Sequence, residues 1–131
     1  MTPVLVTGAG GFIGYHLAAR ILGQGRPVVG LDNLNAYYSV DLKKARLGKL
    51  EEQPGFSFVH LDLADGSGLR SLFEKHRFEL VFNLAAQAGV RHSLTHPQDY
   101  VRANLEGFVN VLESVRHFRT KHLVYASSSS V

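Results

Sequence analysis

The sequence VLVTGAGGFIG at residues 4–14 decides the fold. Its first three residues are apolar and predict a short buried strand, whereas Ile13, Leu17 and Ile21 form the apolar stripe of a helix over residues 12–22. Between these elements lie glycines with the spacing G-x-x-G-x-x-G, namely Gly8, Gly11 and Gly14. Glycine allows a sharp turn and close approach of the backbone to a ligand, and the amides of a helix N-terminus attract phosphate. Strand, turn and helix together therefore predict a site for the pyrophosphate of a dinucleotide.

The second predicted strand, residues 28–31, is followed directly by Asp32. A carboxylate at this place can accept hydrogen bonds from the hydroxyls of the adenosine ribose. No cation follows in the sequence before Lys43, so an anionic 2′-phosphate would be repelled, and we expect NAD to be preferred to NADP. The alternative is a plain strand-to-helix turn with a solvated aspartate. A nucleoside-triphosphate P-loop is excluded because no Gly-Lys-Ser/Thr ending is present.

Short apolar runs alternate with segments of helical period along the rest of the chain. The runs predict five strands, at residues 4–6, 28–31, 56–61, 80–82 and 122–126. Helices are predicted at residues 12–22, at residues 42–50, around residues 69–73 and, as the longest, between Pro97 and the last strand. The apolar stripe of this longest helix consists of Val101, Leu105, Phe108, Leu112 and Val115. Such alternation implies right-handed crossovers. The predicted fold class is α/β, a doubly wound parallel sheet of the Rossmann type in a single domain.

Composition excludes several classes of protein. The 131 residues are 45% hydrophobic and 19% charged, and the net charge of +3 comes from scattered basic residues, which is weak evidence for a nucleic-acid partner. No apolar run approaches the roughly 18 residues of a membrane span, and no secretion signal is recognisable. The absence of cysteine rules out disulfides and thiolate metal sites. We therefore expect neither nucleic acid nor membrane as a partner, and a cytoplasmic location.

Three further strand ends carry residues that suit a ligand crevice. Asp62 follows the third strand and either accepts from the adenine amino group or caps a turn, and both readings stay open. The fourth strand runs into the small residues 84–89, which permit close contact with a flat ligand. The fifth runs into serines 127–130, which form either a solvated turn or a set of hydroxyls for a substrate alcohol. Asn104 falls within the long predicted helix, where a polar residue more often faces solvent.

His92 and His96 have the i, i+4 spacing of helical zinc ligands. However, Ser93 stands where a zinc-protease motif has glutamate, no third ligand is evident, and Pro97 follows at once. We expect no metal site.

The motifs together resemble those of the extended short-chain dehydrogenase/reductases. They are residues 6–14, Leu31-Asp32-Asn33-Leu34-Asn35, Asp62-Leu63, residues 84–91 and Tyr125-Ala126-Ser127-Ser128-Ser129-Ser130-Val131. Within that superfamily they resemble the nucleotide-sugar epimerases, most closely the UDP-glucuronate 4-epimerase group. The resemblance covers the whole chain, and residues 32–38 and 85–91 are the parts that favour the glucuronate group. His92 departs from it, since that group has tyrosine there.

The resemblance implies a role for each motif. It places NAD on residues of four strand ends and the long helix: Gly8, Gly11, Phe12, Ile13 and Gly14 at the pyrophosphate, Asp32, Asn33 and Asn35 at the adenosine ribose, Asp62 and Leu63 at adenine, Leu84, Ala85, Ala86 and Gln87 along the cofactor, and Asn104 near nicotinamide. It places a UDP-sugar substrate on Val90, Arg91, Ser127 and Ser128. Ser128 is the implied catalytic serine, which hydrogen-bonds the sugar O4 during hydride transfer.

The family's catalytic Tyr-x-x-x-Lys does not occur in these residues. The resemblance therefore implies the N-terminal part, residues 1–131, of the NAD-binding domain in an enzyme of more than about 300 residues, with the C-terminal substrate-binding region outside this chain, the sheet incomplete on that side, and a homodimeric assembly. The implied reaction converts UDP-glucuronate to UDP-galacturonate through a 4-keto intermediate, and residues 1–131 alone are expected to be inactive. Alternatives are a UDP-glucose 4-epimerase, a UDP-glucuronate decarboxylase, a 4,6-dehydratase or a non-catalytic dinucleotide sensor. A dehydratase usually has Asp-Glu in place of Ser129-Ser130, which counts against it.

Overall fold

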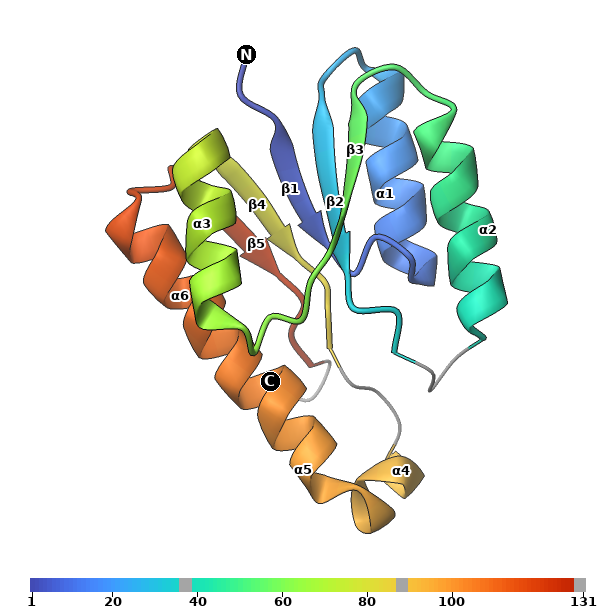
Figure 1. The fold of residues 1–131 in the computed structure, drawn as a ribbon, viewed down its shortest axis with the longest axis vertical. Coiled ribbons are helices and arrows are strands. Elements are labelled where there is room, and N and C mark those ends of the chain that lie inside the picture. Colours follow the sequence, from blue (N-terminus) through green and yellow to red (C-terminus); the bar gives the residue numbers. More distant parts are fainter. Residues whose placement is uncertain (36–38, 87–89, 129–131) are drawn as a thin grey trace.

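The first strand, β1 (Val4–Thr7), is completely buried at the centre of a parallel five-stranded sheet. The computed structural model describes residues 1–35, 39–86 and 90–128 (Figure 1). The strand order is β3-β2-β1-β4-β5, with β2 (Val28–Asp32), β3 (Phe56–His60), β4 (Leu80–Asn83) and β5 (His122–Tyr125). β1 aligns Val4 with Val28 of β2, and Leu5 with Val81 of β4. All five predicted strands are confirmed, each within one residue of its expected end.

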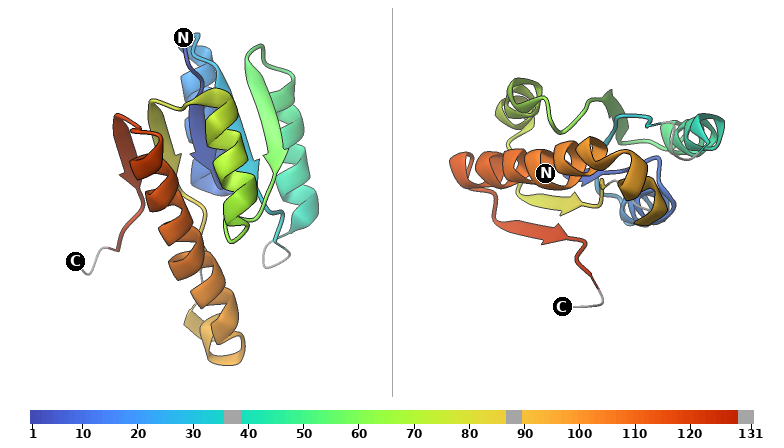
Figure 2. Two further views of the ribbon diagram at one scale, coloured as in Figure 1. Left: turned by 60° about the vertical axis from the view of Figure 1, so that its left-hand side comes forward. Right: turned by 90° about the horizontal axis from the view of Figure 1, so that it is seen from below.

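Helices cover both faces of the sheet. On one face lie α1 (Phe12–Gly23) and α2 (Val40–Glu51), and on the other α3 (Gly66–His76) and α6 (Gly107–His117), as Figures 1 and 2 show. Successive side chains of a strand point to opposite faces, so Val4 and Val6 pack under α1 and α2 while Leu5 packs under α3 and α6. The predicted doubly wound parallel sheet is confirmed.

Two helices begin as their sequences predict. Asp65 caps α3 by accepting a hydrogen bond from Gly68 N at 3.0 Å, and Ser39 caps α2 by accepting from Leu42 N at 3.2 Å. A side-chain oxygen that accepts from the first turn satisfies an amide that has no partner within the helix. α2 is thereby anchored beside the carboxyl end of β2, where it forms part of the cavity described below.

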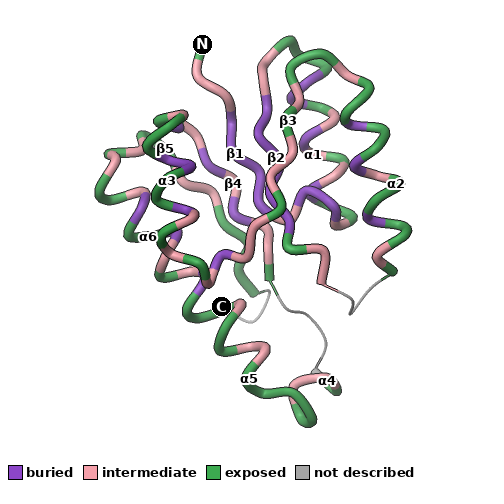
Figure 3. The backbone as a smooth tube through the Cα atoms, in the orientation of Figure 1, coloured by how far each residue is buried: buried purple, intermediate pink, exposed green. Residues whose placement is uncertain are grey.

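The helical run from Pro97 to His117 differs from the regular helix predicted there. It consists of α5 (Pro97–Tyr100), a π-helical segment (Val101–Glu106) and α6, and a short unpredicted helix, α4 (Val90–Thr95), precedes it. Its buried face consists of Gly107, Val111 and Ser114, whereas Val101 and Leu105 of the apolar stripe are more than half exposed. Figure 3 shows that the stretch between α5 and α6 is mostly exposed. The helix packs closely against the residues after β3 at Gly107, because a Cβ added there would be 3.0 Å from Leu63 Cβ.

Among the residues described, no helix is both long enough and apolar enough to cross a membrane.

Candidate functional site

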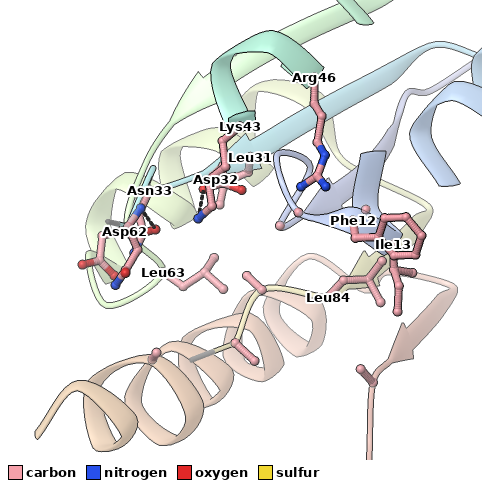
Figure 4. A pocket seen from close by; sticks show the side chains of 18 of the residues that line it. Phe12, Ile13, Leu31, Asp32, Asn33, Lys43, Arg46, Asp62, Leu63 and Leu84 are labelled. Atoms are coloured by element: carbon pink, nitrogen blue, oxygen red, sulfur yellow. Dashed lines mark hydrogen bonds and ion pairs between the residues drawn. The ribbon is translucent and has the colours of Figure 1, made fainter. Parts of the chain in front are cut away.

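A cavity of about 520 Å³ opens at the carboxyl ends of the strands. The chain runs from β1 outward through β2 to β3 and then returns to place β4 on the other side of β1, so the strand order reverses at this point. Ligands of open α/β sheets bind in the crevice formed at such a reversal. Figure 4 shows Phe12, Ile13 and Leu84 toward one end of the cavity, Asp62 and Leu63 toward the other, and Asp32 with Lys43 between.

The glycine turn is built from close backbone contacts. Gly8 has a φ of 73°, in the left-handed region that favours glycine. A Cβ added to Gly14 would overlap the carbonyl oxygen of Gly8, so the first turn of α1 can pack against the end of β1 only with glycine there. Gly8 and Gly14, the first and last glycines of the G-x-x-G-x-x-G spacing, are therefore steric requirements of this turn.

The N-terminus of α1 is suited to an anion. Gly11 is its N-cap and makes no side-chain cap, and the first turn contains no acidic residue. The first amides of a helix have no partners within the helix and carry the positive end of its dipole. The exposed side chains of Phe12 and Ile13, 67% and 66% accessible, flank these amides at the cavity wall. The turn thus combines anion-binding amides with apolar contact surface.

Asp32 is 4% exposed at the end of β2. Its Oδ2 accepts from Gly10 N at 3.0 Å and its Oδ1 accepts from Leu34 N at 2.8 Å. Lys43 Nζ lies 3.6 Å from Oδ1 and forms a buried ion pair with it (Figure 4). A carboxylate offers about four lone-pair sites, so these contacts leave acceptor capacity for ribose hydroxyls. The aspartate also ties the glycine turn to the end of β2.

The expectation that Asp32 has no cation near it is wrong. Although no cation follows Asp32 closely in the sequence, α2 brings Lys43 against it and places Arg46 on the wall of the same cavity, where it donates to Gly10 O. Both were missed as candidate residues. The detectable signal is the position of Lys43 on the buried face of α2 with Leu47 and Leu50, where a lysine requires a specific partner.

Asp62 has both of its oxygens engaged. Oδ1 accepts from Ala64 N at 2.9 Å, which is the turn-capping role, and Oδ2 accepts from Arg102 Nε at 3.1 Å. The next residue is also clamped, because Asn110 Nδ2 donates to Leu63 O at 2.7 Å. The turn cap is therefore present, and contact with adenine remains a prediction for Asp62.

Thr7 joins the ends of the two central strands and was also missed. Its hydroxyl donates to Asn83 Oδ1 at 2.6 Å and accepts from Leu84 N and Ala85 N, each at 3.0 Å. A hydroxyl has one hydrogen and two lone pairs, so all its capacity is used. This places the backbone of residues 84 and 85 against Gly8, where an added Cβ would lie 3.0 Å from Ala85 N.

The structure gathers most of the predicted cofactor residues around this cavity. Those that line it are Gly8, Gly11, Phe12, Ile13, Gly14, Asp32, Asn33, Asn35, Asp62, Leu63, Leu84, Ala85 and Ala86. Gln87 lies outside the described residues, as does the side chain of Val90. Four predicted residues are exposed and are not among the lining residues: Asn104 in the π-helical segment, Arg91 in α4, and Ser127 and Ser128 after β5. Most of the predicted cofactor residues therefore lie around one cavity, and their contacts with NAD remain predictions, as do the roles of Asn104 and of the predicted substrate residues.

The histidine pair lies apart from the cavity. The rings of His92 and His96 stack with centroids 4.3 Å apart, and His92 Nε2 lies 3.1 Å from Asp99 Oδ2. Over residues 1–35, 39–86 and 90–128 there is no cluster of three or more side chains able to hold a metal ion.

Known protein families and individual proteins resemble this chain over nearly its whole length. The model of the NAD-dependent epimerase/dehydratase family matches residues 4–131. A UDP-glucuronate 4-epimerase from Thermodesulfobacterium geofontis is 43% identical over 127 residues, which are 97% of this chain and 39% of that protein.

Two solved structures share the fold. One is a variant of the UDP-glucuronic acid 4-epimerase from Bacillus cereus in complex with UDP-4-deoxy-4-fluoro-glucuronic acid and NAD, with a TM-score of 0.86 and 34% identity over 98% of this chain and 41% of that one. The other is the UDP-glucose 4-epimerase from Thermus thermophilus in complex with NAD, with a TM-score of 0.81 and 35% identity over 96% of this chain and 37% of that one. The chain therefore spans about two fifths of the length of these relatives.

Proposed function

The chain belongs to the NAD-dependent epimerase/dehydratase family, and on that premise we propose that residues 1–131 are the NAD-binding part of a nucleotide-sugar 4-epimerase that interconverts UDP-glucuronate and UDP-galacturonate. The observation that carries the proposal is the convergence of the glycine turn and Asp32 on one cavity at the reversal of strand order. Similarity to UDP-glucuronate 4-epimerases supports the choice of sugar. The remaining substrate-binding region and a homodimeric, cytoplasmic assembly belong to the same proposal.

The lining residues fit NAD by their chemistry. The amides at the start of α1 would neutralise the pyrophosphate, and the buried carboxylate of Asp32 would accept from the adenosine ribose. Asp62 and Leu63 would face adenine, while Leu84, Ala85 and Ala86 would run along the middle of the cofactor. The glycine turn, Asp32, Asp62 and the backbone of residues 84 and 85 are each held in place by a contact described above. The site would therefore bind a dinucleotide without large rearrangement.

The chemistry that bound NAD supplies is reversible hydride transfer at C4 of the sugar, through a 4-keto sugar. This chain's residues would orient the reactants. Ser128 would donate a hydrogen bond at the sugar O4, Val90, Arg91 and Ser127 would contact the UDP-sugar, and Asn104 would lie near the nicotinamide end. A base is needed to take the O4 proton, and a serine hydroxyl, which stays protonated at neutral pH, does not replace it. We therefore expect residues 1–131 alone to bind NAD and not to turn over substrate.

The test separates binding from turnover. Calorimetric titration of the purified protein with NAD and NADP should give at least about tenfold tighter binding of NAD, and equal affinity would contradict the assignment of Asp32 to the ribose. The enzyme that contains this chain is then incubated with NAD and, in separate reactions, with UDP-glucuronate or UDP-glucose, and the products are separated by chromatography. UDP-galacturonate is the expected product. UDP-xylose, or activity on UDP-glucose alone, would identify a decarboxylase or a UDP-glucose 4-epimerase instead.

A further inference from the structure

We propose that Lys43 and Arg46 of α2 form a latent binding site for a phosphomonoester at the ribose 2′ position, held shut by the carboxylate of Asp32. The inference rests on the proposed NAD site. It adds that the protein's discrimination against NADP depends on a single carboxylate, with the cations that a 2′-phosphate requires already in position.

Lys43 and Arg46 both lie close to Gly10 of the glycine turn. Arg46 Nη1 donates to Gly10 O at 3.1 Å, and a Cβ added to Gly10 would lie 3.2 Å from Lys43 Cβ and 3.0 Å from Asp32 Oδ2. Lys43, Arg46 and Asp32 all line the cavity (Figure 4). The ribose hydroxyls that Asp32 would accept from must therefore lie close to both basic side chains.

Lys43 differs from the neighbouring lysines of its helix. It is 9% exposed, whereas Lys44 and Lys49 are exposed to solvent. Burial of an ammonium group is costly without an anion to pair with it. Asp32, at 3.6 Å, is the anion that compensates it. Replacing that carboxylate by a neutral side chain would leave a buried cation at the ribose end of the cavity, and a ligand phosphate could then take the place of the carboxylate.

Arg46 supplies the second cation. A guanidinium has five N–H donors, and the hydrogen bond to Gly10 O uses one of them. Arginine suits phosphate because its planar donors bind two oxygens at once. A lysine and an arginine on one wall are a sufficient donor set for a phosphomonoester, so a change of specificity needs no new basic residue.

The experiment compares ADP-ribose with 2′-phospho-ADP-ribose, which differ only in the phosphate. Calorimetric titrations of the purified protein use wild type, Asp32→Ser, Asp32→Ser with Lys43→Met, and Asp32→Ser with Lys44→Met as the matched control. Wild type should prefer ADP-ribose by about tenfold or more, and Asp32→Ser should prefer the 2′-phosphate by about tenfold, a total change of about 100-fold. Adding Lys43→Met should weaken 2′-phosphate binding about tenfold, and adding Lys44→Met by less than about twofold.

The outcomes are distinguishable. Failure of wild type to bind ADP-ribose would overturn the proposed function and this inference together. Binding of ADP-ribose by wild type, with no gain of 2′-phosphate affinity in Asp32→Ser or an equal loss in the two lysine variants, would overturn the inference alone. If Asp32→Ser does not fold, Asp32→Asn takes its place in each of the three variants. The preference for ADP-ribose should still reverse and Lys43→Met should still weaken 2′-phosphate binding more than Lys44→Met, whereas an unreversed preference would contradict the proposal.

Discussion

The cavity wall has two halves that repeat one local motif in different surroundings. In the half formed by β1 and β2, Asp32 accepts from the amide two residues later and pairs with Lys43 of a helix. In the half formed by β3 and the helical run from Pro97, Asp62 does the same with Ala64 N and Arg102. The difference is burial, since the side chain of Asp32 is 5% exposed and that of Asp62 is 36% exposed.

Burial decides what each pair contributes. Removing one partner of a buried pair leaves an uncompensated charge and costs about 3–5 kcal/mol, whereas exposed pairs are worth about 0–1 kcal/mol. The half around β2 should therefore be rigid and intolerant of substitution. The half around β3 should be adjustable, so it is where related enzymes can vary without loss of the fold.

The largest expected effect is in the glycine turn of the rigid half. Gly14→Ala should lower the free energy of unfolding by at least about 3 kcal/mol and abolish NAD binding, because the new methyl group overlaps a backbone carbonyl that cannot move aside. Gly23→Ala, in the same helix with open space around it, is the control and should be neutral or stabilising by up to about 1 kcal/mol. Chemical denaturation measures both. Equal effects would show that the turn is not sterically closed.

Asp32→Asn comes next. The amide nitrogen would face Gly10 N or Leu34 N, and Lys43 would lose its counter-charge. We expect a loss of about 3 kcal/mol in unfolding free energy and of about 30-fold in NAD affinity, by denaturation and calorimetry. An affinity unchanged within about twofold would remove Asp32 from the ribose.

The same substitution at the other strand end, Asp62→Asn, should have a much smaller effect. Asparagine keeps an oxygen for Ala64 N, so stability should fall by less than about 1 kcal/mol. NAD affinity should fall about three- to fivefold, because a neutral acceptor replaces a charged one at adenine. Unchanged NAD affinity in calorimetry would leave Asp62 with its turn-capping role alone.

Arg102→Gln should have the smallest effect. The side chain is 59% exposed, so loss of its charge should change the free energy of unfolding by about 0.5 kcal/mol or less and NAD affinity by less than about twofold. Thermal melts at low and high salt measure how much of the change in stability comes from the ion pair between Arg102 and Asp62. A loss as large as that of Asp32→Asn would contradict the difference between the two halves.

Local chemistry explains what could be predicted from the sequence. The strands follow from apolar runs, and the glycine turn follows from spacing, because Gly8 and Gly14 satisfy contacts within a few residues of each other. Asp32 ends the strand next to that turn, so its place in the cavity follows from the parallel sheet. These residues could be predicted because the residues they contact either lie close to them in the sequence or lie opposite them on the neighbouring parallel strand.

Three features could not be predicted from the sequence, because they depend on tertiary contacts that leave no local sequence pattern. Lys43 meets Asp32 only because α2 packs back over the end of β2. The π-helical segment is a change of hydrogen-bond register that leaves no distinct apolar period. The stripe at Val101 and Leu105 resembles a buried face, but the packed face uses Gly107, since a small residue permits contact with the backbone after β3.

The order of the strands in the sheet also predicts the order in which parts of the chain fold. β1 meets β2 after a single helix, but Thr7 and Asn83, which are hydrogen-bonded across β1 and β4, are 76 positions apart. Contacts between distant residues require closure of a long loop and form more slowly than local ones. We therefore expect β1, β2 and the helix between them to form before β4 docks, as pulsed hydrogen exchange during refolding can measure. Because residues 84–86, which follow β4, line the cavity, the ability to hold a dinucleotide would appear only at the end of folding, and ligand binding would mark the completion of the fold.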